Sequence, residues 1–325
     1  MMAAFTADLF APEESRLTVL SMGLGQDSTA LLELYLADDS FREKYAPRDF
    51  LVLNSDTGDE YPETYQHRRR LESRCNSAGV EFQVITPDMG FHSPSWKTLR
   101  HYYRNHQCIG SKAYPKTCTH RLKLDPIYSF LEHWVSQRYG VQCGRKQGLR
   151  EFAATHGKIN VLLGIAKGEE KRVADASENP KRWFREAIQP VYPLIELGMD
   201  RKACQDYIDG QGQNVPPPSN CMCCPFLALE ELEFQRRFYP AQLADWVDLE
   251  GAKLEKHRDK ESTVVTLPSG KTKVENKNYG VFGTKPLPTM IEEAKERFSD
   301  WSDRRIQEYR FSHGHCVASA DRHGE

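Results

Sequence analysis

The sequence predicts an α/β fold with a doubly wound, mostly parallel sheet, followed by a smaller, mainly helical region. Short apolar segments typical of buried strands alternate with longer amphipathic segments. Apolar residues make up 39% of the 325 residues and charged residues 28%, which is ordinary for a globular protein and argues against wholesale disorder. The formal net charge of −2 gives no global attraction for nucleic acid, so nucleic-acid binding would need a local basic patch.

The alternation is clearest near the N-terminus. Strands are predicted at 16–21, 50–54 and 81–86, with helices at 27–37 and 62–78 between them. Such strand–helix–strand units place their strands in parallel. Residues 87–120 are predicted to be irregular. Further along the chain we expect a strand at 158–165, helices at about 126–139 and 200–209, helical stretches at 228–256 and 288–310, and a hairpin within 262–283.

Two regions are expected along the chain. A run of Gly, Gln and Pro begins at Gly210, so we predict an α/β nucleotide-binding core at 1–209 and a cysteine-containing, mainly helical region at 210–325. No apolar run reaches the ~20 residues that span a bilayer, and the N-terminus lacks the pattern of a signal peptide. The expectation is a cytoplasmic protein without membrane contact, in a compartment where disulfides are rare.

A glycine-rich loop, within 21–29, follows the first predicted strand. In open α/β sheets ligands bind beyond the carboxyl ends of the strands, and glycines let the backbone approach an anion closely. The next helix points free N–H groups at that anion, and Ser28 and Thr29 add hydroxyl donors. Phosphate or pyrophosphate is the natural ligand, and a plain strand–helix turn is the alternative. The loop is neither a P-loop nor a dinucleotide motif, since no Gly-Lys-Ser/Thr follows and Ser28 replaces the third glycine.

The loop and several later segments resemble the PAPS-reductase-like branch of the adenine nucleotide alpha hydrolase superfamily, including its phage and bacterial members. Gly23-Leu-Gly-Gln-Asp-Ser28 is similar to the PP-loop Ser-Gly-Gly-x-Asp-Ser, with Gly23 in place of Ser and Leu24 in place of Gly. The common order of the segments over 16–230 is more specific than any single motif. The other segments are Asp56-Thr57-Gly58 with Tyr61–Thr64, Pro115–Thr119 with Arg121 and Lys123, Gly164-Ile165 with Glu169 and Arg172, Pro193-Leu194, and Cys221-x-x-Cys224-Pro225-Phe226.

The resemblance implies an HUP-like, PP-loop fold that holds ATP, or the sulfonucleotides PAPS or APS, across the carboxyl edge of the sheet. ATP-using members split the bond between the α- and β-phosphates, adenylate a substrate and release pyrophosphate. Asp27 or Asp56 would place Mg²⁺, which prefers oxygen ligands, and cationic side chains would neutralise phosphate charge. The predicted catalytic residues are Asp27, Lys123 and Arg172, and the predicted nucleotide-binding residues are Ser21, Gly23, Gly25, Gln26, Asp27, Ser28, Thr29, Asp56, Thr57 and Gly164.

The cysteines suggest a metal site. A Cys-x-x-Cys pair lets two sulfurs in one turn reach one ion or cluster, and a second pair lies upstream. The predicted ligands are Cys108, Cys118, Cys221 and Cys224, which leaves Cys223 as the spare. Three interpretations stay open: a [4Fe-4S] cluster, which resembling proteins often carry, a structural Zn²⁺, and buried or redox-reactive free thiols.

Three functions are consistent with these features. The first is an ATP-dependent, adenylating sulfurtransferase that modifies a nucleic acid or nucleotide and takes sulfur from a donor protein. The second is a sulfonucleotide reductase, although the tail Ser312-His-Gly-His-Cys316 lacks the Glu-Cys-Gly-Leu-His pattern of such enzymes. The third is a nucleotide-binding subunit of a DNA-modification or defence complex, without turnover of its own.

Two further patterns have structural and functional interpretations. Trp183 and Phe184 lie between basic residues, which suits either base stacking or the edge of an amphipathic helix. Arg68-Arg69-Arg70 is predicted to be an exposed face of the second helix.

Overall fold

The computed structural model describes residues 15–260, 263–275 and 278–313, and these residues form two compact units. Unit 1 comprises residues 15–56, 62–93 and 120–217. Unit 2 comprises residues 57–61 and 94–119 together with the described residues from 218 onward. The units therefore interleave along the chain, whereas the sequence analysis placed one boundary after residue 209.

Unit 1 contains a five-stranded sheet in which every neighbouring pair is parallel. This confirms the predicted α/β fold with a parallel sheet. The strand order is β3-β2-β1-β4-β5. The strands are β1 (Leu17–Ser21), β2 (Asp49–Ser55), β3 (Glu81–Ile85), β4 (Ile159–Leu163) and β5 (Ile188–Val191).

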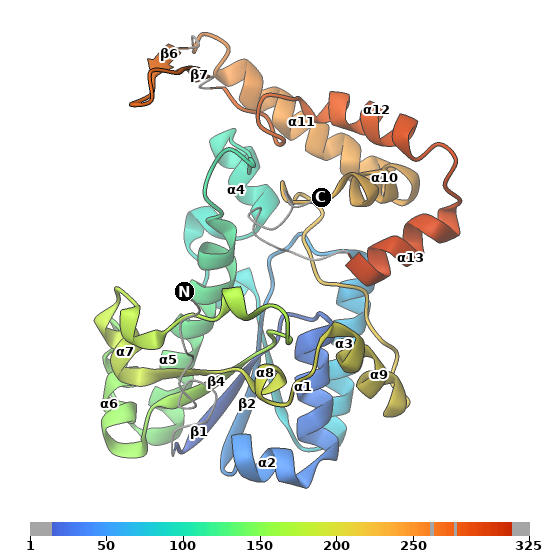
Figure 1. Cartoon of the computed structure of the whole chain (residues 1–325). Helices are drawn as coiled ribbons and strands as arrows, with labels where there is room; N and C mark the ends of the chain where they lie inside the picture. The colour runs from blue at the N-terminus through green and yellow to red at the C-terminus, as the bar shows by residue number, and fades with distance from the viewer. Residues whose placement is uncertain (1–14, 261–262, 276–277, 314–325) are drawn as a thin grey trace. The chain divides into compact units, whose positions relative to one another are not determined.

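Helices cover both faces of this sheet, as a doubly wound fold requires (Figure 1). Strand β1 sends alternate apolar residues into two cores, because successive side chains of a strand point to opposite faces. One core packs against α5 (Asp125–Tyr139) and α6 (Gln147–His156), and the other against α1 (Gln26–Ala37), α3 (Pro62–Ser77) and α9 (Arg201–Gly210). The other helices and turns of unit 1 are α2 (Asp39–Tyr45), η2 (Pro87–Met89), η4 (His120–Leu124), η5 (Glu170–Arg172), η6 (Ala176–Glu178), α7 (Arg182–Ala187) and α8 (Pro193–Glu196).

Unit 2 is mainly helical, as predicted for the C-terminal region. The expected helical stretch 228–256 is two helices, because Pro240 cannot donate the backbone hydrogen bond that continuation needs. The stretch 288–310 is likewise divided. The elements of unit 2 are η3 (Pro94–Trp96), α4 (Leu99–His106), α10 (Leu229–Phe238), α11 (Pro240–Lys256), the antiparallel pair β6 (Thr263–Thr266) and β7 (Thr272–Glu275), α12 (Leu287–Arg297) and α13 (Asp303–His313).

Helix α4 lies in the segment that was predicted to be irregular. Its residues are mostly polar, but the buried Leu99 and Tyr103 lie one turn apart on one face, and the side chain of Thr98 accepts a hydrogen bond from the His101 amide and caps its N-terminus. A short apolar face and a polar cap thus account for this helix.

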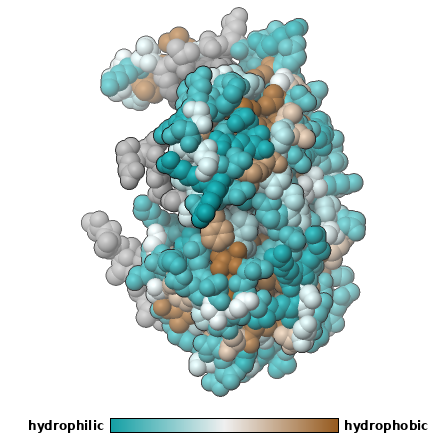
Figure 2. Space-filling model, turned by 90° about the vertical axis from the view of Figure 1, so that its right-hand side faces the viewer, coloured by the Kyte–Doolittle hydropathy of each residue, from teal (hydrophilic) through white to brown (hydrophobic). Residues whose placement is uncertain are grey.

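None of the described helices has both the length and the apolar composition that crossing a bilayer requires. The face drawn in Figure 2 is mostly hydrophilic, with small, separate apolar areas. Cys316 of the predicted tail motif lies outside the described residues.

Candidate functional site

The sheet order places two loops of unit 1 at a topological switch point. From β1 the chain crosses to β2 on one side, and β4 pairs with the other side of β1. In such sheets the crevice for a ligand opens between the carboxyl ends of the two strands where the order reverses, here β1 and β4. The loop after β1 carries Gly23–Ser28, and the residue that follows β4 is Gly164. The predicted loop therefore lies where this architecture binds ligands.

The loop departs from its expected pattern at Leu24, and the backbone shows why this matters. Leu24 has φ of 63°, a left-handed conformation that costs a non-glycine residue about 1–2 kcal/mol. Its side chain is 3% exposed and belongs to the core beneath α1. Burial of a leucine side chain contributes about 1.5–3 kcal/mol, which offsets the strain. The glycine of the PP-loop pattern is thus replaced by a residue that anchors the turn in the core.

Helix α1 begins at Gln26, in the loop that follows β1. Its N-cap residue is Gly25, and no side chain caps the first turn. A β-carbon placed on Gly164 would lie 2.7 Å from the Ser28 nitrogen and 3.1 Å from the Asp27 carbonyl carbon. Only glycine fits so close to backbone atoms. The first turn of α1 therefore meets the end of β4 through backbone atoms alone, and the role of Gly164 in nucleotide binding stays a prediction.

Asp27 belongs to a partly buried charge cluster. Burial raises the pKa of its carboxyl to about 6, the charge of Arg201 opposes this shift, and the charge of Glu169 adds to it. Arg201 Nη2 lies 3.9 Å from Asp27 Oδ2 and 2.8 Å from Glu169 Oε1. Glu169 also pairs with Arg172. Within the described residues, Asp27 Oδ1 is buried and has no hydrogen-bond partner.

That unsatisfied oxygen fits a hard cation, because Mg²⁺ takes carboxylate oxygens as ligands. The carboxylate of Asp56, the alternative predicted ligand, is engaged elsewhere. Asp56 Oδ1 accepts from the Tyr65 hydroxyl at 3.1 Å, and Oδ2 pairs with Arg68 Nη1 at 2.8 Å. Of the two candidates, the geometry favours Asp27.

Other predicted side chains of the loop have structural roles. Gln26 is buried, donates from Nε2 to the Pro216 carbonyl at 2.9 Å and accepts from Gln205. The Thr29 hydroxyl lies 2.9 Å from His67 Nε2, and burial lowers the pKa of His67 to about 4. Ser28 Oγ donates to the Gly25 carbonyl at 3.2 Å. These three side chains are therefore engaged within the protein.

The remaining predicted residues of unit 1 lie along the same edge of the sheet. Ser21 is the last residue of β1 and is half-buried. Lys123 lies on η4, and this turn is held at the end of β2 because Ser55 Oγ donates to the Leu122 carbonyl at 2.6 Å. Arg172 is half-exposed in its ion pair with Glu169. The structure brings Asp27 and Arg172 into one cluster, and the sequence had not singled out Arg201, the third member.

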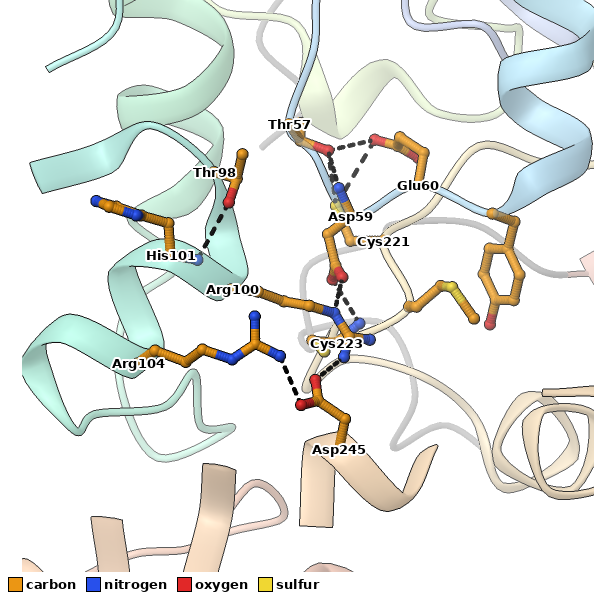
Figure 3. Close-up of polar contacts among 12 residues, drawn as sticks. Thr57, Asp59, Glu60, Thr98, Arg100, His101, Arg104, Cys221, Cys223 and Asp245 are labelled. Carbon is orange, nitrogen blue, oxygen red and sulfur yellow. Dashed lines mark hydrogen bonds and ion pairs between the residues drawn. The ribbon is translucent and has the colours of Figure 1, made fainter. Parts of the chain in front are cut away.

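Thr57 belongs to unit 2, where it contacts the cysteine segment, and its role as a nucleotide-binding residue stays a prediction. Its hydroxyl donates to Glu60 Oε1 at 3.2 Å and lies 3.7 Å from Cys221 Sγ. The Cys221 thiol donates to Glu60 Oε1 at 3.6 Å, and the backbones of these two residues form a β-bridge (Figure 3). Segments 57–61 and 221–224, far apart in the sequence, thus lie side by side.

Charged residues that the sequence pattern did not indicate hold this segment in place. Asp59 is almost fully buried, accepts the Cys223 amide on Oδ2 at 2.9 Å and pairs through Oδ1 with Arg100 of α4. Arg100 also pairs with Asp245, which in turn binds Arg104 (Figure 3). Burial raises the pKa of Asp59, and Arg100 opposes this shift. Only the position of Asp59 beside the Asp56-Thr57-Gly58 segment could have drawn attention to it.

The predicted ligands Cys108, Cys118, Cys221 and Cys224 all lie in unit 2. Burial raises the pKa of the Tyr103 hydroxyl, with further contributions from Cys223, Cys118 and Cys224. Cys108 has a different environment from these three cysteines. Burial raises the pKa of its thiol, and the charges of the nearby Lys256 and Lys253 oppose this shift.

Among the described residues no three His, Cys, Asp or Glu side chains are grouped as a metal site. The ligand set Cys108, Cys118, Cys221 and Cys224 stays a prediction.

Trp183 and Phe184 pack inside unit 1. The ring of Tyr128 meets Trp183 edge-on at 5.2 Å and Phe184 at 5.6 Å between centroids. Both aromatic side chains pack against the core that contains α5 and α6. The amphipathic-helix interpretation therefore describes this pair better than base stacking.

No family model matches this chain, and no curated protein matches its sequence. One solved structure with a related arrangement is the U34-tRNA thiolase NcsA from Methanococcus maripaludis, solved with its [4Fe-4S] cluster. The alignment covers 89% of this chain and 75% of the thiolase, at 9% sequence identity and a TM-score of 0.34.

Proposed function

We propose that unit 1 binds ATP at the Gly23–Ser28 loop and adenylates an acceptor, as the activating step of sulfur transfer in nucleic-acid or nucleotide modification. The observation that carries the proposal is the approach of Gly164 to the Ser28 amide at the switch point of the sheet. Uncapped amides at the start of a helix form a site for phosphate. The resemblance of the loop to the PP-loop suggests that this phosphate belongs to an adenine nucleotide.

In the proposed reaction an acceptor oxygen attacks the α-phosphorus of ATP. The bond to the β-phosphate oxygen breaks, pyrophosphate leaves, and the acceptor carries AMP. A sulfur nucleophile from a donor protein then displaces AMP. Mg²⁺, when bound, would neutralise phosphate charge, and Asp27 is the residue that would hold it.

The chain's own groups contribute mainly by positioning and charge. The amides at the start of α1 would bind the phosphates, and Gly164 leaves room for this backbone to stay in place. Arg201 and Arg172 balance the carboxylates of Asp27 and Glu169. A cation bound to the Asp27 carboxylate would leave the charge of Arg201 less neutralised, and Arg201 could then attract the phosphates.

The test starts with binding. Isothermal titration should give a dissociation constant for Mg²⁺-ATP in the micromolar range for the wild-type chain. Asp27→Asn should weaken Mg²⁺-dependent binding at least tenfold, because it removes the charge on the unsatisfied oxygen. The matched control is Asp209→Asn, on an exposed position of α9 in the same unit. Equal effects of the two substitutions would contradict the role of Asp27.

Product analysis then separates the three functions. AMP and pyrophosphate formed from ATP in the presence of a small-RNA fraction support adenylation. Sulfite formed from PAPS with thioredoxin would replace the proposal by sulfonucleotide reduction. Tight ATP binding without any product, together with a co-purifying partner, would favour a nucleotide-binding subunit. Absence of binding to both ATP and PAPS overturns the enzymatic proposal altogether.

A further inference from the structure

An open, cationic groove runs along α3 in unit 1, outside the nucleotide loop. It has a volume of about 820 Å³, and its lining combines cationic, amide and hydroxyl side chains with two small apolar contributions from Leu36 and Ala78. No carboxylate of the described residues lines it. The polar residues that line it are Gln66, Arg69, Arg70, Ser73, Arg74, Ser77 and Gln213.

The three consecutive arginines of α3 have different roles. Arg68 pairs with Asp56 at 2.8 Å and is mostly buried. Arg69 and Arg70 are exposed, and within the described part of the chain neither guanidinium forms an ion pair or a hydrogen bond. Arg74 pairs with the fully buried Glu33 at 2.6 Å, and this ion pair fixes the position of the Arg74 guanidinium. The groove thus presents two arginines without an ion pair in the described residues, Arg69 and Arg70, beside the paired Arg74.

The spacing of these groups suits an extended anion. Gln66, Arg69 or Arg70, Ser73 or Arg74, and Ser77 follow one another on successive turns of α3, and from Gln66 to Ser77 the helix rises about 16 Å. One strand of a nucleic-acid duplex carries a phosphate about every 3.4 Å of its axis, so this stripe spans several phosphates. An open groove without acidic side chains favours such a strand over a small ligand, which a site would enclose.

We propose that this groove binds the sugar–phosphate backbone of the acceptor nucleic acid, with Arg69 and Arg70 each contacting a phosphate. Gln66, Ser73 and Gln213 supply neutral hydrogen bonds to phosphate and sugar oxygens. The inference rests on the proposed function for its choice of nucleic acid as the partner. It adds a binding surface that is separate from the adenylation site and carries no sequence specificity of its own.

The test measures binding of a 20-nucleotide single-stranded RNA to the whole chain over a range of salt concentrations. Arg69→Gln/Arg70→Gln is expected to weaken binding about tenfold and to lower the slope of log K against log salt by about 1.4, since each phosphate contact contributes about 0.7. The matched control is Arg304→Gln/Arg305→Gln, which removes the same charge from two consecutive arginines of α13. Unchanged binding in the control and an altered slope in the groove variant support the proposal.

Equal losses of RNA affinity in both variants would show a general effect of charge and would overturn the proposed role of the groove. A salt-dependence slope that is unchanged in the groove variant would also overturn it. Binding of inorganic phosphate, anionic lipid vesicles or an acidic peptide through Arg69 and Arg70, without binding of RNA, would also overturn it. Titration of ATP into the same variants separates the two proposals. Loss of RNA binding with intact ATP binding places the effect in the groove, whereas a wild-type chain that binds RNA but no ATP contradicts only the proposed function.

Discussion

Substitution of Gly164 by alanine is the sharpest test of the nucleotide site. The added methyl carbon would lie 2.7 Å from the Ser28 nitrogen and 3.1 Å from both the Ser28 α-carbon and the Asp27 carbonyl carbon. All three are backbone atoms, so no side chain can rotate away. The end of β4 and the start of α1 must therefore move apart. Overpacking of this kind costs about 1–3 kcal/mol.

Two measurements follow from that displacement. Calorimetry of unfolding should show a lower midpoint temperature, by roughly 2–4 °C for each kcal/mol in a unit of this size. Isothermal titration should show ATP affinity reduced about tenfold or more, because the amides that would bind the phosphates no longer hold their positions. The binding loss should exceed what partial unfolding explains at the assay temperature.

The control for Gly164→Ala is Gly210→Ala in the same unit. A β-carbon on Gly210 meets no atom within 4 Å, and this substitution should change stability by less than about 0.5 kcal/mol. If Gly164→Ala binds ATP as tightly as the wild type and unfolds at the same temperature, the close approach does not form the site. The proposal for the loop would then fail.

The remaining predictions concern buried charges. Acidification from about pH 6.5 to 4 should cost about 3 kcal/mol as the unfolded chain protonates His67, whose folded pKa is about 4, while protonation of Asp27, whose folded pKa is about 6, returns a similar amount. Asp27→Asn should thus lose about 3 kcal/mol more than the wild type in denaturant titrations at pH 4 relative to pH 7, and parallel pH profiles would refute this. Asp59→Ala should destabilise unit 2 by about 1–3 kcal/mol, because it removes one of the two carboxylates that pair with Arg100 and leaves the buried Cys223 amide without its acceptor. Faster labelling of the buried Cys223 thiol would report it, and the exposed control Asp303→Ala should leave that rate unchanged.

The elements that were predicted well are those with a strong local pattern. The first three strands and helices α1 and α3 agree with their predicted ranges to within about two residues, because short apolar runs and helical periodicity are local properties of the chain, whereas the short helix α2 was not predicted. Helix α4 was missed, since its apolar face is only the two residues Leu99 and Tyr103 in an otherwise polar segment, and the Thr98 cap marks its start. Helices also end where proline removes a backbone donor, as at Pro240.

The candidate site was predicted only in part, for a physical reason. The sequence by itself determined a parallel α/β unit with a glycine-rich turn after its first strand, since strand and turn propensities depend on near neighbours. Only the tertiary structure decided that Gly164 lies against Ser28, that Arg201 joins Asp27 and Glu169, and that Asp59 holds the cysteine segment through Arg100. Such contacts join residues distant along the chain, and burial sets their strength, so no local pattern encodes them.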